Sequence, residues 1–205
     1  MHRYNATTPV WLKGILENEF GVKPRDIHWY VAEPDIAEES LRPPPADVRV
    51  SFVDSPRTRE HAIELVERGA IDAALEPYQL HENPKMRYLM PDFHQAEKEF
   101  FRRSRAYSLN HLFVLREEIA TRNPRVAAAL YEALKEANDR ADRYRDEKQR
   151  REAEWEREVM GEDFIYSLHQ GCARRSVETL MDYQVQQGIL DKKPEIEDLF
   201  FPEFL

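Results

Sequence analysis

The sequence predicts an α/β fold with a mainly parallel sheet. Three short runs are rich in β-branched, aromatic or other apolar residues, as strands are, at 26–32, 48–53 and 70–75. Helical patterns precede the first run and separate the second from the third. Strands that alternate with helices in this way favour a parallel arrangement. With 205 residues, of which 41% are hydrophobic, the chain can build one sizeable core or two small ones.

The first predicted helix begins with no strand leading into it. Thr7 and Thr8 can cap this helix, Pro9 suits its first helical position, and Gly21 is expected to end it. Its apolar face is supplied by three residues, Trp11, Ile15 and Leu16. The helix therefore presents a polar start and a buried side.

The middle of the chain mixes turn and helix signals. The proline run at 42–45 predicts a surface loop, which fits so short a stretch better than a polyproline ligand. Helices are predicted at 55–69, with a glycine at the end, and at 91–104. The apolar segment 109–115 predicts a buried strand between these helices and the C-terminal part.

From Arg116 onward the pattern is helical. Asn123-Pro124 separates a short turn from a second helix that is expected to continue to about residue 158, because the residue before proline avoids the helical region. The charge run in its second half is typical of a solvated helix with i,i+4 ion pairs and lacks the apolar heptads of a coiled coil. A last helix is predicted at 172–187, ending at Gly188.

The composition restricts the classes of function. A net charge of −9 argues against a general nucleic-acid binder, which needs a basic face. The single cysteine, Cys172, excludes an internal disulfide and a multi-cysteine metal site. No run of about 18 apolar residues is present, so no membrane span is expected, and no signal peptide is visible.

Several motifs along the chain resemble one known enzyme family. They begin with Tyr4, Thr7 and Trp11 and continue in order to the C-terminus. The later motifs are GAIDAAL (69–75), YLMPDF (88–93), LNHLFVLREEI (109–119), RNPRVAAALYEALKEA (122–137), MGEDF (160–164) and the YQVQQGIL and EIEDLFFPE segments of the ending. No single motif is specific, but in this order and spacing they resemble the 4,5-dihydroxyphthalate decarboxylase family.

The resemblance implies the type II periplasmic-binding-protein fold. In that fold the chain builds half of lobe 1, crosses to lobe 2, and returns. Residues 1–106 would then form a complete lobe 2 and residues 107–205 the mostly helical returning part of lobe 1. The chain would lack the N-terminal half of lobe 1, which also accounts for the abrupt first helix. The returning strand would expose apolar surface that the missing strands normally cover.

The resemblance also implies site residues. Decarboxylation of a hydroxylated aromatic carboxylate needs groups that hold carboxylates and an acid that protonates the ring. The start of the first helix, with Arg3, Tyr4, Thr7 and Thr8, is the expected carboxylate anchor. His111 matches the family's histidine and is the expected acid. From the residues alone, an ordinary helix cap and a core histidine remain the alternatives.

Other site residues follow with less direct support. Arg57 can bind a second carboxylate, although a purely solvated role is its alternative, and Arg174 matches an arginine of the family. Two residues near the first helix depart from the family, which carries an acidic residue at position 3 and an arginine at position 13. The segment 108–110 also departs from the family's Pro-Ile-Met. These departures suggest an altered substrate or a loss of decarboxylase activity.

Three functions are consistent with these features. The first is a decarboxylase of a hydroxylated aromatic dicarboxylate, in aromatic-compound catabolism, with no organic cofactor and no metal in the expected site. The second is a solute-binding protein of an ABC-type transporter for a small organic anion. The third is a non-functional fragment. The expected partners are a small organic anion and a second copy of the chain, with no nucleic acid. The expected compartment is the cytoplasm, or the periplasm if a signal peptide lies upstream of Met1.

Overall fold

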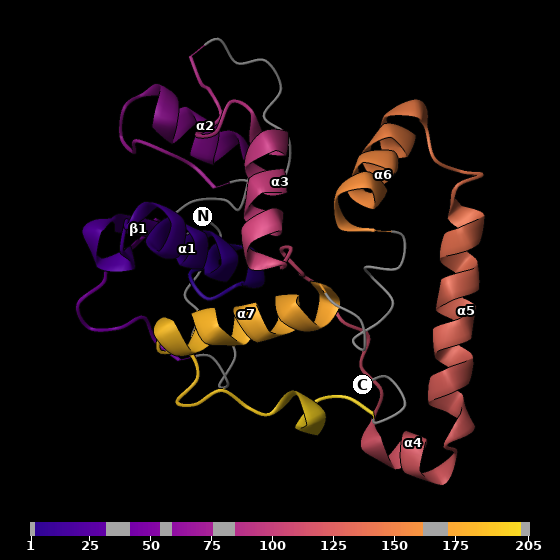
Figure 1. Cartoon of the computed structure of the whole chain (residues 1–205). Coiled ribbons are helices and arrows are strands. Elements are labelled where there is room, and N and C mark those ends of the chain that lie inside the picture. The colour runs from indigo at the N-terminus through magenta and orange to yellow at the C-terminus, as the bar shows by residue number, and fades with distance from the viewer. Residues whose placement is uncertain (1–2, 32–41, 54–58, 76–84, 162–171, 202–205) are drawn as a thin grey trace.

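The computed structural model describes residues 3–31, 42–53, 59–75, 85–161 and 172–201 (Figure 1). Within these ranges the chain is mostly helical, with one small parallel sheet, which agrees with the predicted α/β class. The elements, in chain order, are α1 (Thr7–Phe20), η1 (Pro24–Asp26), β1 (His28–Val31), β2 (Arg49–Phe52), α2 (Arg59–Glu67), α3 (Phe93–Ser104), α4 (Glu117–Arg122), α5 (Arg125–Ala141), α6 (Glu147–Met160), α7 (Cys172–Gln186) and η3 (Ile196–Asp198).

The sheet of the described residues consists of β1 and β2, which run parallel with His28 opposite Arg49. Trp29 and Val31 point from β1 into a core that also contains the ring of Tyr4. The Trp29 indole N–H donates to the Pro24 carbonyl at 2.8 Å, so this aromatic side chain is buried without losing its hydrogen bond. Both strands confirm predictions made from β-forming residues.

The prediction of a third strand at 70–75 is wrong. The backbone N–H groups of Ala70 and Ile71 both donate to the Leu65 carbonyl, at 2.9 and 3.4 Å, and so close the end of α2. Gly69 makes this reversal with φ of 68°, a left-handed conformation that glycine adopts without steric cost. The segment follows α2 as turns and irregular backbone, because its first donors are used at the helix end and do not pair with β1 or β2.

Helix α7 packs across α1, and both helices have the predicted ends. Gly21 (φ 70°) and Gly188 (φ 72°) follow their last turns in the left-handed conformation. The rings of Trp11 and Tyr183 meet edge to face with centroids 5.5 Å apart. Gly14 faces the same ring so closely that a Cβ added there would lie 2.1 Å from it. This close approach buries Val10, Trp11, Ala106 and Tyr183 in one core.

The charged C-terminal part contains two helices where one long helix was predicted over 124–158. The chain leaves the helical path after α5, and Asp146 begins α6 by accepting the Gln149 amide N–H at 2.8 Å. The Gln149 side chain in turn accepts the Asp146 amide N–H at 3.0 Å, which completes a capping box. The aspartate and glutamine were read as part of a solvated helical surface, although their i,i+3 spacing is a helix start signal.

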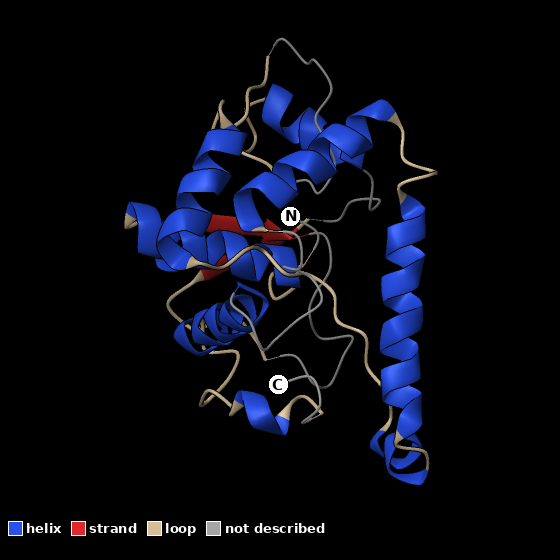
Figure 2. Cartoon of the chain, turned by 45° about the vertical axis from the view of Figure 1, so that its right-hand side comes forward, coloured by secondary structure: helices blue, strands red, loops and turns tan. Residues whose placement is uncertain are grey.

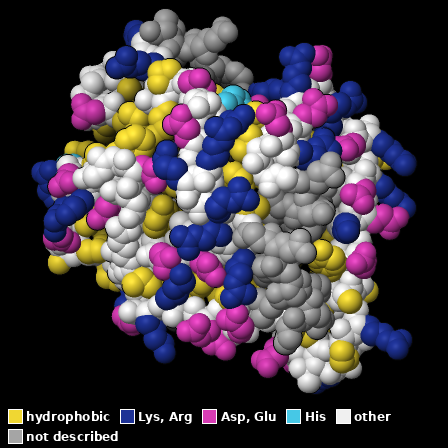
Figure 3. Space-filling view, in the orientation of Figure 1, with side chains coloured by type: hydrophobic (Ala, Val, Ile, Leu, Met, Phe, Trp, Pro, Cys, Tyr) yellow, Lys and Arg dark blue, Asp and Glu magenta, His cyan; other side chains and the backbone are white. Residues whose placement is uncertain are grey.

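Helix α5 stands to one side of the other elements in both views (Figures 1 and 2). Of its described side chains only Ala127 is buried, while Leu130 is 38% exposed. Acidic and basic side chains are interspersed over the face that carries α3 and α7 (Figure 3). No helix in the described ranges combines the length and the apolar character that a membrane crossing requires.

The segment 109–115 is not the buried strand that was predicted. It runs as a stretched loop between α3 and α4 (Figure 2), and Leu112, Phe113 and Val114 are 52%, 78% and 90% exposed. No strand lies beside it among the described residues, which explains why its apolar side chains stay uncovered. Apolar exposure at this segment was expected from the resemblance. The division into lobes at 106/107 stays a prediction, and the α1–α7 core joins residues from both sides of it.

Candidate functional site

The start of α1 differs from the predicted cap. Ala6 occupies the N-cap position with extended backbone (φ −67°, ψ 156°), and no side chain caps the helix. Thr7 and Thr8 are the first two helical residues, so their hydroxyl groups are not used as caps. The Thr8 hydroxyl instead donates to Asn110 Oδ1 at 3.2 Å. This hydrogen bond joins the helix start to a residue 102 positions further along the chain.

The segment that precedes His111 is fixed against α1 and α7 by three donors. The Trp11 indole N–H donates to the Leu109 carbonyl at 2.9 Å, beside the Thr8–Asn110 hydrogen bond. Upstream, the Tyr107 amide N–H donates to the Ser176 hydroxyl of α7 at 2.9 Å. These contacts bring His111 to the region where α1 begins, and its side chain is exposed there. Two of the sequence-predicted site residues, Thr8 and His111, therefore come from distant parts of the chain and lie in one region.

Tyr4 is a core residue beside the same helix. It is 1% exposed, and its ring meets Trp29 edge to face with centroids 5.9 Å apart. Burial raises the pKa of its phenol well above the usual range, with a further contribution from the negative charge of Asp47. The phenol therefore stays neutral at physiological pH, and its ring has a structural role next to the first turn of α1.

Lys13 of α1 places a buried positive charge against Tyr4. Its ammonium group donates to the Tyr4 carbonyl at 2.9 Å and lies 3.3 Å from the centre of the Tyr4 ring. The side chain is 1% exposed. In the sequence this residue stands out only as a departure from an arginine of the family. Its position on the buried face of α1, three residues after Val10, is the signal that could have identified it.

The remaining predicted site residues are placed less centrally. Arg3 and Thr7 are half-buried at the approach to α1, and Arg57 lies outside the described residues. Arg174 on α7 donates through Nε to Glu178 at 3.1 Å and through Nη2 to Glu197 at 2.6 Å. Its guanidinium is thus engaged with two carboxylates of the chain, and the hydrogen bond from it lowers the pKa of the Glu197 carboxyl.

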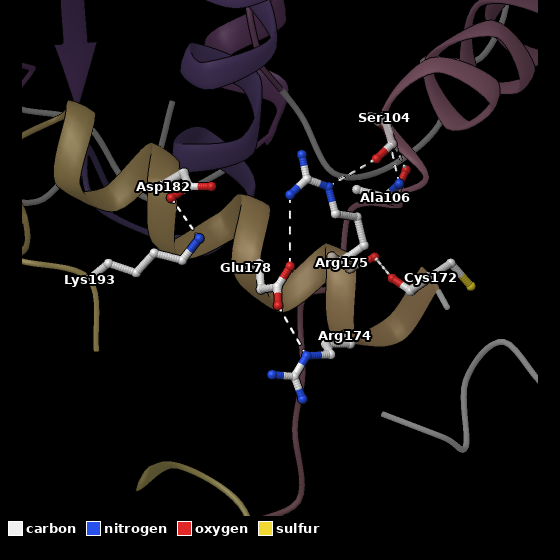
Figure 4. A network of polar contacts seen from close by, with 9 residues as sticks. Ser104, Ala106, Cys172, Arg174, Arg175, Glu178, Asp182 and Lys193 are labelled. Carbon is white, nitrogen blue, oxygen red and sulfur yellow. Dashed lines mark hydrogen bonds and ion pairs between the residues drawn. The ribbon is translucent and has the colours of Figure 1, made fainter. Parts of the chain in front are cut away.

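Figure 4 shows that Glu178 lies between two arginines of α7. Arg174 approaches one carboxylate oxygen and Arg175 the other, the latter at 3.7 Å. Arg175 also donates to the Ser104 carbonyl at 3.2 Å, which ties α7 to the end of α3. In this arrangement a substrate carboxylate at Arg174 would compete with Glu178 and Glu197.

No group of three or more His, Cys, Asp or Glu side chains in the described ranges is arranged to hold a metal ion. Cys172 is buried at the start of α7, and desolvation raises the pKa of its thiol, so it is held in the neutral form. The start of α1 brings together the Thr7 and Thr8 hydroxyl groups, backbone N–H groups and the Arg3 side chain, and His111 follows Asn110 in the chain.

Comparison with known proteins gives one partial similarity of functional interest. No protein-family model matches the chain. The chain is 30% identical over 139 residues to the 4,5-dihydroxyphthalate decarboxylase of Comamonas testosteroni. The aligned part covers 64% of this chain and 41% of the decarboxylase, so the chain spans less than half of the length of this relative. The similarity supports a distant, partial relationship to a decarboxylase of a hydroxylated aromatic dicarboxylate.

Proposed function

We propose that the chain belongs to a decarboxylase-like protein that binds a hydroxylated aromatic carboxylate such as 4,5-dihydroxyphthalate. The observation that carries the proposal is the Thr8–Asn110 hydrogen bond of 3.2 Å, because Asn110 is the residue that precedes His111. The partial similarity to a 4,5-dihydroxyphthalate decarboxylase supports the substrate class. In the same proposal, residues 1–106 form one lobe and residues 107–205 the returning part of the other.

The start of α1 is the proposed carboxylate anchor. With alanine at the N-cap, no side chain occupies the first-turn donors, and the helix dipole favours negative charge there. The side chains of Arg3 and Thr7 lie at this approach and would supplement the backbone donors. Such local groups are needed because the whole chain carries a net charge of −9, which repels anions at longer range.

His111 is the proposed proton donor. Its imidazolium would protonate the ring carbon that bears the carboxylate, with the electron density supplied by the ring hydroxyl groups. The bond to the carboxylate carbon then breaks, carbon dioxide leaves, and the bonding electrons restore the aromatic ring. An imidazole is suited to this step because its ordinary pKa lies near neutral pH. Because the His111 side chain is exposed, a ligand has room to approach its imidazole ring.

The first experiment separates binding from turnover. Titration of the chain with 4,5-dihydroxyphthalate is expected to shift the NMR signals of the His111 ring and of the Thr7 and Thr8 amides. Where carbon dioxide release is measurable, His111→Asn should reduce the rate by about 100-fold or more and leave the binding shifts at α1 in place. Thr8→Val should weaken both binding and turnover because it detaches Asn110 from the helix start.

A matched control uses another exposed histidine. His28 lies on β1, where it contacts Ser51 at 2.8 Å and its ring lies against that of Tyr30, so His28→Asn should change neither quantity. Binding without any carbon dioxide release would contradict the enzymatic assignment and favour a solute-binding role. Absence of shifts at both α1 and His111 at millimolar ligand would overturn the proposed site itself.

A further inference from the structure

One face of the two-stranded sheet carries a serine and a histidine in direct contact. Trp29 and Val31 of β1 are buried in the core, so His28 and Tyr30 point to the other face of the sheet. Ser51 of β2 lies on that same face, and His28 Nε2 is 2.8 Å from the Ser51 hydroxyl oxygen. His28 is exposed and Ser51 is half-buried, so a small molecule in solvent can reach the pair.

The register of the two strands holds this pair in place. Because β1 and β2 run parallel, Tyr30 lies opposite Ser51, and His28 lies opposite Arg49. The imidazole therefore reaches its partner along the diagonal between the strands. The Tyr30 ring lies against the His28 ring with centroids 4.4 Å apart, which restricts rotation of the imidazole. Side chains on paired strands are positioned more precisely than side chains on loops.

Two other serines of the described chain make a different kind of hydrogen bond. Ser104 donates to the Phe100 carbonyl at 2.8 Å and Ser176 to the Cys172 carbonyl at 2.6 Å. A backbone carbonyl is not a base that removes the hydroxyl proton. Ser51 contacts an imidazole nitrogen, which accepts this proton when the other ring nitrogen carries the hydrogen. The pair therefore has the geometry of a nucleophile beside its general base.

We propose that Ser51 is a nucleophile activated by His28 and that it accepts the acyl group of small aryl esters. The Ser51 oxygen bonds to the ester carbonyl carbon, and its proton passes to Nε2 of His28. The bond from that carbon to the aryl oxygen breaks, the aryl oxide leaves, and the imidazolium releases its proton to solvent. Water, deprotonated by the same imidazole, then attacks the acyl-serine, and the carboxylic acid leaves with Ser51 restored.

Aryl esters are the proposed substrate class because their leaving group is stable as an anion. It departs without a separate acid, so the nucleophile and the base on the sheet are sufficient for the first step. The proposal is independent of the proposed decarboxylase function, since neither residue belongs to the start of α1 or to the segment 109–111.

The test treats the full chain with p-nitrophenyl acetate at neutral pH, quenches with acid and locates acetyl groups by peptide mass spectrometry. Ser51 is expected to be acetylated. His28→Asn should lower the rate of this acetylation by about 100-fold, as loss of a general base does. Neither side chain belongs to a core, so circular dichroism should show an unchanged fold.

Ser108 is the matched control within the same chain. It is exposed between α3 and α4, so it samples the reactivity of an ordinary serine hydroxyl. Its acetylation should be about 100-fold slower than that of Ser51 and should not respond to His28→Asn. Equal acetylation of the two serines would overturn the proposal. So would acetylation of Ser51 that keeps its rate in the His28→Asn variant.

A second measurement replaces the hydroxyl with a thiol. The native Cys172 is buried, so Ser51→Cys and Ser108→Cys each add an accessible thiol. The thiol at position 51 should react with iodoacetamide at lower pH than the thiol at position 108, because a neighbouring imidazolium stabilises the thiolate. His28→Asn should remove this difference. Identical pH profiles at the two positions would show that His28 does not act on the group at position 51, and the proposal would fail.

Discussion

Two helix pairs in this molecule are held together by different kinds of contact. Between α1 and α7, the Trp11 and Tyr183 rings meet inside a core and Gly14 allows the helix backbones to approach. Gln187, just after α7, is 5% exposed and donates to the Val10 carbonyl at 2.9 Å. The centre of this interface is apolar, and a hydrogen bond from Asn18 Nδ2 to the Gln186 side-chain oxygen, at 2.9 Å, lies at its exposed edge.

Between α3 and α6, the contacts are charged and partly exposed. His94 Nε2 lies 4.0 Å from a Glu152 oxygen, and Lys98 lies 3.5 Å from a Glu158 oxygen. The His94 ring meets Trp155 with centroids 4.9 Å apart, while its buried Nδ1 has no hydrogen-bond partner among the described residues. Ion pairs at such exposed positions contribute about 0–1 kcal/mol each because water and salt screen them.

The difference matters for the candidate site. Leu109 and Asn110, which precede His111, are bonded to α1, and Tyr107 is bonded to α7. The site region is therefore fixed by the tightly packed pair and not by the charged one. Changes in the α1–α7 interface should disturb both stability and ligand binding, whereas changes in the α3–α6 interface should affect only the attachment of α6.

The largest effect is expected from Gly14→Ala. The new methyl group would lie 2.1 Å from the Tyr183 ring, so α1 and α7 must separate or the ring must move. Overpacking of this kind should lower the free energy of unfolding by about 3 kcal/mol. Urea denaturation followed by circular dichroism measures the loss, and the His111 NMR signals should shift in the folded fraction.

A double-mutant cycle tests the cause of that loss. In a Tyr183→Ala background the methyl group of Gly14→Ala has space, and alanine favours the helix by up to about 1 kcal/mol over glycine. The second substitution should then be neutral or stabilising. If Gly14→Ala costs the same amount with and without the tyrosine ring, the close approach of the two helices is not the source of the effect.

A smaller effect is expected from Trp11→Phe. Phenylalanine keeps an aromatic ring against Tyr183 but removes the N–H that donates to the Leu109 carbonyl at 2.9 Å. Loss of this bond should cost about 1 kcal/mol and leave the 109–111 segment less constrained. Hydrogen exchange of the Leu109 amide should accelerate, while Trp29→Phe, which removes a comparable bond to Pro24, should leave that amide unchanged.

The sequence predicts those parts of the fold that local signals define. Glycines in the left-handed conformation end α1 and α7 at the expected residues, and β-forming runs mark β1 and β2. The wrong predictions have two kinds of cause. Some local signals were misinterpreted, and some features depend on tertiary contacts that a sequence does not reveal. The Asp146–Gln149 capping box was visible but was assigned to a solvated helix. The exposure of 109–115 depends on the absence of a neighbouring strand among the described residues, which no local pattern reveals.

The candidate site shows the same limit. Thr8 and His111 were chosen for their chemistry and for the resemblance, but Asn110, which connects them, was noted only as a departure. Its role depends on a contact across 102 residues, and no spacing rule predicts such a contact. Arg174 was expected at the ligand, yet its pairing with Glu178 and Glu197 is visible only in three dimensions. The roles of all these residues at a ligand stay predictions.

The smallest effect concerns the pH dependence of the α3–α6 contact. Desolvation raises the pKa of Glu97 and of Glu156 above the ordinary value of 4.5, and repulsion from Glu152 raises both further. Repulsion from Glu156 also contributes to the raised pKa of Glu97. A raised pKa means that the docked helices bind protons more tightly than separated ones. Docking is therefore strongest below the ordinary carboxyl pKa and weakens as the pH rises through the raised values.

Because Glu97 and Glu156 are only partly withdrawn from water, the change in docking free energy should stay below about 0.5 kcal/mol. The three tryptophans report separately, since Trp11 lies in the α1–α7 core, Trp29 in the sheet core and Trp155 on α6. In ¹⁹F NMR of 5-fluorotryptophan protein, only the Trp155 signal should move between pH 4 and pH 7, a range of about three units around the carboxyl pKa values. Glu97→Gln should reduce that movement, and Glu154→Gln on the same helix as Trp155 should not. Equal movement of the Trp11 signal would mean that α1–α7 responds to the same protons, and the contrast between the two interfaces would then fail.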